Sequence, residues 1–159
     1  PDGTLQHAGV VLGLNGVGDR PWIGTRRGYA GPYGRARAVR EVSALITACA
    51  VVSRERYLEV GGMNETLAVS CNDLDLCLRL GRAGYRHLLS PYAELVHHES
   101  ASRGYADDPR NAQANRDEEA RFAAQWPREL ADDPLYNPNL TLQGSAYALA
   151  WPPRTGSNP

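Results

Sequence analysis

The chain has 159 residues, of which 42% are hydrophobic and 22% are charged, and its formal net charge is −1. These are the values of an ordinary globular domain rather than of a disordered chain, and the near-neutral charge excludes the broad basic surface typical of nucleic-acid binding. All 17 basic residues are arginine, which excludes the Schiff-base and phosphate-loop chemistry that depends on lysine.

Three cysteines, an odd number without metal-type spacing, are expected to be reduced core thiols. No apolar stretch approaches the roughly 20 residues of a membrane span, and no signal-peptide pattern is present. We therefore expect a cytoplasmic protein. Because the chain begins at Pro1 rather than at a methionine, we expect a segment excised from a longer polypeptide.

In chain order, residues 5–14 predict a strand, residues 15–35 a long loop rich in glycine, arginine and aromatic residues, and residues 42–52 a buried strand. A short helix is expected after Ser53, a plausible N-cap, with Gly61-Gly62 as its stop signal.

The strongest helix pattern covers residues 73–82, where apolar side chains recur at i, i+3, i+4 and i+7. Short strands are predicted on both sides of a Ser90-Pro91 turn, at residues 85–89 and 93–97. Asp108-Pro109 predicts the start of a polar helix that reaches about Trp126. We assign residues 1–150 to one domain and residues 151–159 to an extended or disordered tail.

Asp73 and Asp75 stand at the start of this best-predicted helix, where free amides and the helix dipole stabilise a carboxylate. Two interpretations are open. Asn72 or Asp73 is simply the N-cap, or Asp73 is a general base at the edge of an α/β sheet. A capping aspartate would have a lowered pKa, which would keep it ionised as a proton acceptor.

His97-His98 ends an apolar run and offers a weak metal signal, because no chelating histidine spacing is present. Arg103, in the polar loop that follows, suits a diphosphate or is a solvated surface residue. Gly61 and Gly62 stop a helix or let a sugar approach the backbone. The aromatic loop at 22–33 either stacks on sugar rings or packs against the domain.

Seven segments in this order resemble the C-terminal, acceptor-side half of bacterial family 2 glycosyltransferases, including O-antigen and rhamnosyltransferase-like members. The resemblance runs from Pro1 to about Trp151. The segments that carry it are 2–13, 48–54, 60–65, Asn72-Asp73-Leu74-Asp75-Leu76-Cys77-Leu78-Arg79, 83–86, His97-His98-Glu99-Ser100-Ala101-Ser102-Arg103-Gly104 and Asp133-Pro134-Leu135-Tyr136-Asn137-Pro138-Asn139-Leu140.

The resemblance implies an α/β fold: the C-terminal portion of a Rossmann-like GT-A fold, a mixed sheet with flanking helices. It implies a hexosyltransferase-type enzyme that moves a sugar, with inversion, from a UDP- or dTDP-sugar to a glycan or lipid-linked acceptor in surface polysaccharide synthesis. Mg²⁺ or Mn²⁺ is the implied cofactor, and the inner membrane face is an alternative, peripheral location.

By the same resemblance, Asp73 matches the catalytic base and His97 a metal ligand. Gly61 and Gly62 match the acceptor-side loop, and Asn72 and Asp75 are further expected substrate contacts, as is Arg103.

Two departures from the family pattern matter. Asn72 replaces the usual glutamate before the base, and nothing in the chain matches the Asp-x-Asp motif of the family's donor side. That motif is expected before residue 1, so we predict little or no transfer by this chain alone, and self-association through exposed strand edges. The alternative is a non-catalytic glycan-binding or structural domain of the same fold. A metal-dependent hydrolase is a weaker alternative, because no chelating histidine spacing supports it.

Overall fold

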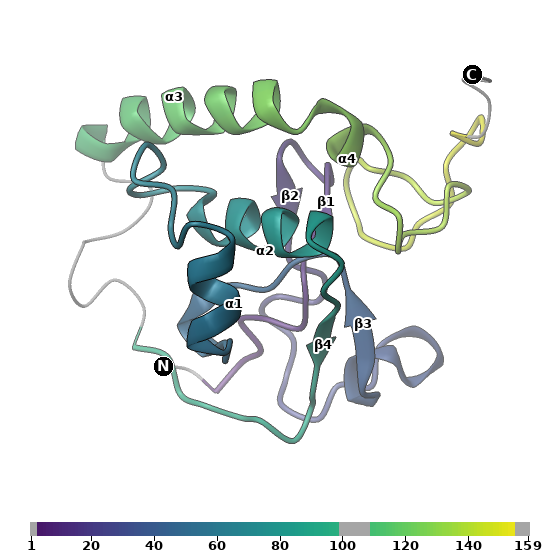
Figure 1. The fold of residues 1–159 in the computed structure, drawn as a ribbon. Helices are drawn as coiled ribbons and strands as arrows, with labels where there is room; N and C mark the ends of the chain where they lie inside the picture. Colours follow the sequence, from purple (N-terminus) through teal and green to yellow (C-terminus); the bar gives the residue numbers. More distant parts are fainter. Residues whose placement is uncertain (1–2, 99–108, 155–159) are drawn as a thin grey trace.

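The computed structural model describes residues 3–98 and 109–154. The chain is mixed α/β, with helices around two small antiparallel sheets (Figure 1). The first sheet pairs β1 (Val11–Leu12) with β2 (Gly18–Asp19), and the second pairs β3 (Arg40–Val42) with β4 (His87–Leu89). The helical elements are η1 (Pro32–Arg37), η2 (Thr47–Cys49), α1 (Arg54–Glu59), α2 (Asn72–Arg82), α3 (Pro109–Gln125) and α4 (Pro127–Ala131).

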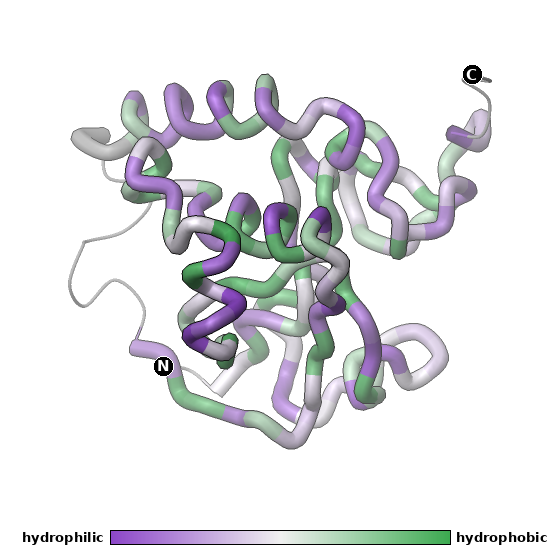
Figure 2. The backbone as a smooth tube through the Cα atoms, in the orientation of Figure 1, coloured by the Kyte–Doolittle hydropathy of each residue, from purple (hydrophilic) through white to green (hydrophobic). Residues whose placement is uncertain are grey.

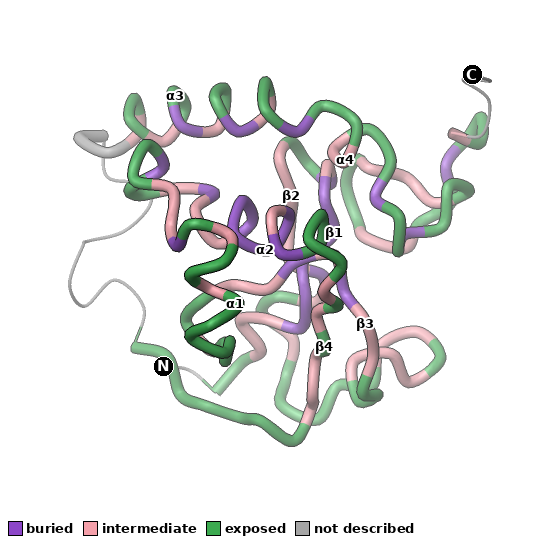
Figure 3. The backbone as a smooth tube through the Cα atoms, viewed as in Figure 1, coloured by how far each residue is buried: buried purple, intermediate pink, exposed green. Residues whose placement is uncertain are grey.

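The core lies between α2, α3 and the first sheet. Leu12, Leu74 and Phe122 are buried in one hydrophobic cluster with Trp126. Figure 1 shows α3 running alongside α2 and the loop that precedes it, and Figure 3 shows the buried positions gathered along α2 and β1. Hydrophilic residues predominate on the outer side of α3 (Figure 2). This packing fixes the position of the α2 N-terminus.

The three helices predicted from local signals are confirmed. α1 begins after Ser53, whose side chain accepts a hydrogen bond from the backbone N–H of Arg56. α2 ends at Arg82, as predicted from the apolar spacing of residues 73–82. α3 begins at Pro109 and ends at Gln125, while the predicted N-cap Asp108 lies outside the described residues.

The strand predictions are largely wrong. Residues 5–14 contain only the two-residue β1, since Gly9 and Gly13 adopt positive φ values of 88° and 72° on either side of it. A Cβ on Gly13 would lie 1.8 Å from the carbonyl oxygen of Leu130, so this backbone packs directly against α4. The predicted loop 15–35 in turn contains β2.

The predicted buried strand at 42–52 is also wrong. β4 pairs only with residues 40–42, so the chain after Val42 lacks a partner strand along most of its length and turns into η2. Val51 is fully exposed. Residues 85–89 do contain a strand, β4, but residues 93–97 form none and are exposed. Apolar composition alone did not show that these runs lack neighbouring strands.

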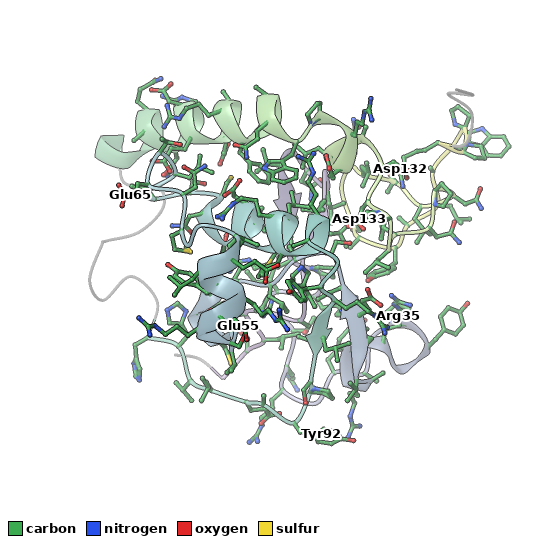
Figure 4. The ribbon with its side chains drawn as sticks, viewed as in Figure 1. Arg35, Glu55, Glu65, Tyr92, Asp132 and Asp133 are labelled. Atoms are coloured by element: carbon green, nitrogen blue, oxygen red, sulfur yellow. The ribbon has the colours of Figure 1, made fainter. Side chains whose placement is uncertain are left out.

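Asp133 joins three distant segments at the other end of the core. Its buried carboxylate accepts hydrogen bonds from the backbone N–H groups of Leu12 and Leu135, both at 2.8 Å, and from the hydroxyl of Ser43. Figure 4 labels Asp133 beside its exposed neighbour Asp132. The sequence analysis did not identify this residue as structural.

The first residues of the predicted tail contact the domain. The Arg154 guanidinium donates to the carbonyl oxygens of Leu140 (2.7 Å), Ala131 (3.1 Å) and Asn137 (3.4 Å). The domain boundary at residue 150 stays a prediction. No helix within the described part of the chain is long and apolar enough to cross a membrane.

Candidate functional site

Asp73 lies in the first turn of α2 and is half-buried. Its Oδ1 accepts a hydrogen bond of 2.9 Å from the backbone N–H of Leu74. Burial raises the pKa of Asp73 above its ordinary value, although the N–H groups of Leu74 and Thr47 and the charge of Arg20 act in the opposite direction. The prediction of a lowered pKa was therefore wrong. A raised pKa makes this carboxylate a better proton acceptor near neutral pH.

The N-cap prediction is corrected as well. α2 already includes Asn72, which is half-buried, and the N-cap position belongs to Cys71 in a left-handed conformation with φ of 61°. Neither Asn72 nor Asp73 is the N-cap, and the Cys71 side chain makes no capping hydrogen bond. Asp73 is thus not needed as the helix cap.

Asp75 is completely buried, and both of its carboxylate oxygens are hydrogen-bonded. Oδ2 accepts from Nε of Arg79 at 2.8 Å, and Oδ1 accepts from the Gln125 amide and the Trp126 indole, both at 3.0 Å. Arg79 also donates to the carbonyl of Val60. Asp75 therefore ties α2 to α3 and to the glycine turn, and has no surface available for the predicted acceptor contact.

Gly61 and Gly62 end α1 in a Schellman motif. The N–H of Gly61 donates to Leu58 and that of Gly62 to Tyr57, with φ values of 83° and 72° at the two glycines. The predicted stop signal is confirmed. Gly61 is exposed, and an added Cβ there would meet no atom within 4 Å, so this turn also leaves open space on its outer side.

His97 is exposed, and its Nδ1 lies 2.7 Å from the amide oxygen of Gln6. Among residues 3–98 and 109–154, no three histidine, cysteine, aspartate or glutamate side chains lie close enough together to hold a metal ion. The described residues alone therefore do not form a site for the predicted Mg²⁺ or Mn²⁺, and the role of His97 stays a prediction. Arg103 lies outside the described residues.

Two of the three cysteines, Cys71 and Cys77, have unreactive thiols. Cys71 and Cys77 are buried, Cys49 is half-buried, and all three are free. Burial raises the pKa of both Cys71 and Cys77 to about 11, so these thiols are protonated at neutral pH. The prediction of reduced core thiols is confirmed for Cys71 and Cys77, whereas Cys49 is free but lies outside the buried core.

Two basic residues, Arg20 and His7, were not identified from the sequence. The charge of Arg20 acts on both Asp73 and His7. His7 is half-buried, and its Nε2 lies 3.3 Å from the backbone nitrogen of Ile46. Arg20 follows β2, whereas His7 precedes β1, so the Arg20 cation acts on an imidazole and on a carboxylate that come from separate segments. The local sequence carries no signal for this arrangement.

An open cavity of about 270 Å³ lies beside Arg20, between the loop after β2 and residues 144–146. Trp22, on its wall, stacks on Tyr147 with ring centroids 5.2 Å apart and planes 12° apart, and the Arg40 guanidinium lies 5.6 Å from the Trp22 ring. Of the two interpretations of the aromatic loop, packing accounts for Trp22.

Glu118 is a further residue that the sequence analysis did not single out. Its buried carboxylate, on α3, accepts hydrogen bonds from three consecutive backbone N–H groups, those of residues 68–70. This loop leads directly into α2. The sequence did contain a signal that Glu118 is buried. Phe122 and Trp126 follow it at i+4 and i+8, which places Glu118 on the apolar face of the helix.

Sequence comparisons relate the chain to much longer proteins. It is 42% identical, over 96% of its length, to the uncharacterised protein y4gI of Sinorhizobium fredii, of which it covers 17%. It is 35% identical, over 98% of its length, to the O-antigen biosynthesis protein RfbC of Myxococcus xanthus, of which it covers 12%.

A shorter match of 65 residues, at 38% identity, covers 41% of the chain and 21% of an N-acetylglucosaminyl-diphospho-decaprenol L-rhamnosyltransferase of Mycobacterium tuberculosis. The chain thus spans less than a quarter of each of these relatives. No protein-family model and no solved structure matches it. The similarity supports a glycosyltransferase-like relationship.

Proposed function

We propose that this chain is the acceptor-side part of a family 2 glycosyltransferase of GT-A fold that acts in surface polysaccharide synthesis. The names of two relatives, an O-antigen biosynthesis protein and a rhamnosyltransferase, support the reaction class. The observation that carries the proposal is Asp73, a half-buried carboxylate of raised pKa at the start of α2. The donor is a nucleotide-sugar such as a UDP- or dTDP-sugar, and the acceptor is a glycan or lipid-linked hydroxyl.

In the proposed reaction, an acceptor hydroxyl attacks the anomeric carbon of the donor while Asp73 takes the hydroxyl proton. The new glycosidic C–O bond forms on the face opposite the leaving group, the bond to the diphosphate breaks, and the nucleoside diphosphate departs with its electron pair. The anomeric configuration is therefore inverted. Arg20 lies near this carboxylate and favours its ionised form before the proton is transferred.

The requirement for Mg²⁺ or Mn²⁺ and the role of His97 as its ligand are part of the proposal. Arg103 is proposed as a diphosphate contact, and Asn72, Gly61 and Gly62 as the acceptor side. We assign Asp75 to packing rather than to the acceptor, because its carboxylate is completely buried.

The test is turnover in the full-length protein with Asp73→Asn. A general base contributes about 10²–10⁴-fold, so turnover should fall by that factor while donor binding, measured by calorimetry, stays unchanged. Asp132→Asn, at an exposed aspartate, is the matched control. Full turnover by Asp73→Asn would refute the assignment and favour a non-catalytic glycan-binding or structural domain. The isolated chain should transfer little or no sugar, and detectable donor consumption would contradict that expectation.

A further inference from the structure

Glu118 makes an unusual set of contacts for a side chain on a polar surface helix. It is 5% exposed, and its two carboxylate oxygens accept from the backbone N–H groups of Ala68 at 3.1 Å, Val69 at 2.9 Å and Ser70 at 2.6 Å. A buried carboxylate is costly unless its oxygens are hydrogen-bonded. These donors come from one short stretch of loop, so the contact fixes the direction of that stretch.

The loop held by Glu118 ends where α2 begins. Ser70 is followed by Cys71, in its left-handed conformation, and α2 then starts with Asn72 and Asp73. The loop makes no side-chain cap for α2, because Cys71 forms no capping hydrogen bond. Glu118 therefore supplies, from another helix, the anchor that a capping side chain ordinarily gives locally.

The same face of α3 also holds the chain that follows Asp73. Gln125 lies seven residues after Glu118, two turns along the helix, and donates to Asp75 at 3.0 Å. Glu118 thus fixes the chain three to five residues before Asp73, and Gln125 fixes it two residues after. Figure 1 shows α3 running along this part of the chain. The chain on both sides of Asp73 is therefore held by one helix.

We propose that Glu118 is a positioning residue that sets the direction of the Asp73 carboxylate by holding the loop at residues 68–70. This inference rests on the proposed role of Asp73. A residue that only stabilised the fold would change the amount of folded enzyme, not its chemistry. A positioning residue changes turnover per folded molecule, since a displacement of about 1 Å in a reacting group costs up to about 100-fold.

The experiment compares Glu118→Gln with Glu119→Gln in the full-length protein. Both substitutions remove one negative charge from adjacent positions of α3, but only Glu118 binds the amides of residues 68–70. We expect kcat of Glu118→Gln to fall about 10- to 100-fold, with the donor KM unchanged and Glu119→Gln close to wild type. Because the loosened loop admits water to Asp73, the acid limb of the kcat/KM profile should move to lower pH.

A second variant, Glu118→Asp, keeps the charge and shortens the side chain by one methylene. It replaces Glu118→Gln in the experiment if that variant does not fold. A fall in its kcat at an unchanged melting temperature supports the proposal. Wild-type kcat and pH profile per folded molecule in either variant would overturn it. Asp73→Asn separates the two proposals: if it retains turnover, the role of Asp73 itself fails. If only Asp73→Asn loses turnover, the role of Glu118 alone fails.

Discussion

The stability of this protein below neutral pH should depend on the half-buried imidazole of His7. Its Nε2 lies 3.3 Å from the backbone nitrogen of Ile46. Because an amide N–H can only donate, Nε2 must be the unprotonated acceptor and Nδ1 must carry the proton. Burial, followed by the positive charges of Arg20 and Arg40, lowers the pKa of His7 from 6.5 to about 4. Protonation would break the bond to Ile46 and add a third charge beside two arginines.

The direction of the effect follows from proton binding in the two states. The unfolded chain binds this proton near pH 6.5 and the folded chain near pH 4, so between these values the unfolded state carries more protons and stability rises with pH. The stabilisation is fully present above the unfolded pKa and is lost as the pH falls towards 4. It amounts to roughly 3 kcal/mol at most, against a total of about 5–15 kcal/mol for a typical domain.

Urea denaturation between pH 4.5 and 7.5 measures this loss. The variant His7→Gln offers an acceptor to the Ile46 N–H without titrating, so wild type should lose roughly 2–3 kcal/mol more than the variant over this range. His98→Gln, at an exposed histidine, should follow wild type. Parallel stability curves for wild type and His7→Gln, or an imidazole of His7 that titrates near pH 6.5 by NMR, would refute the reasoning.

Four further outcomes are expected. Because burial disfavours the charged form of Asp73, Asp73→Asn should raise the melting temperature at pH 7, and a lower value would contradict this. Asp75→Ala leaves buried donors unpaired and should lower the free energy of unfolding by about 3–5 kcal/mol, whereas Asp132→Ala should change it by less than about 0.5 kcal/mol. Gly61→Ala and Gly62→Ala should each cost about 1 kcal/mol or more for their positive φ. Calorimetry should show the larger loss for Gly62, where a Cβ would also meet an aromatic ring at 3.2 Å, and equal losses would contradict that contact. Light scattering should detect self-association, and a monomer at high concentration would count against it.

The helices were predictable because their signals are local. Ser53 and Gly61-Gly62 bound α1 through contacts within a few residues, and the apolar spacing of α2 needs only a helix with one buried face. The strands were not predictable from apolar runs, since a strand needs a neighbour. Residues 42–52 and 93–97 are as apolar as many strands, yet β4 pairs with only three residues.

The candidate site was predictable only in part. Asp73 was identified because it starts a helix, but the direction of its pKa depends on burial by distant segments. His7, Arg20 and Glu118 were missed because their partners lie tens of residues away in the sequence. Glu118 shares a helix face with Phe122, and a carboxylate on an apolar face is a signal that its partner lies inside the protein.

The contact between Asp133 and Leu12 also bears on how the chain assembles during synthesis. The hydrogen bond joins residues 121 positions apart. During synthesis, residue 133 must therefore emerge from the ribosome before the backbone of β1 gains this acceptor. Contacts of such wide separation slow folding, because the loop must close before they form. A ribosome stalled before residue 133 would therefore present a chain in which β1 lacks this closing contact.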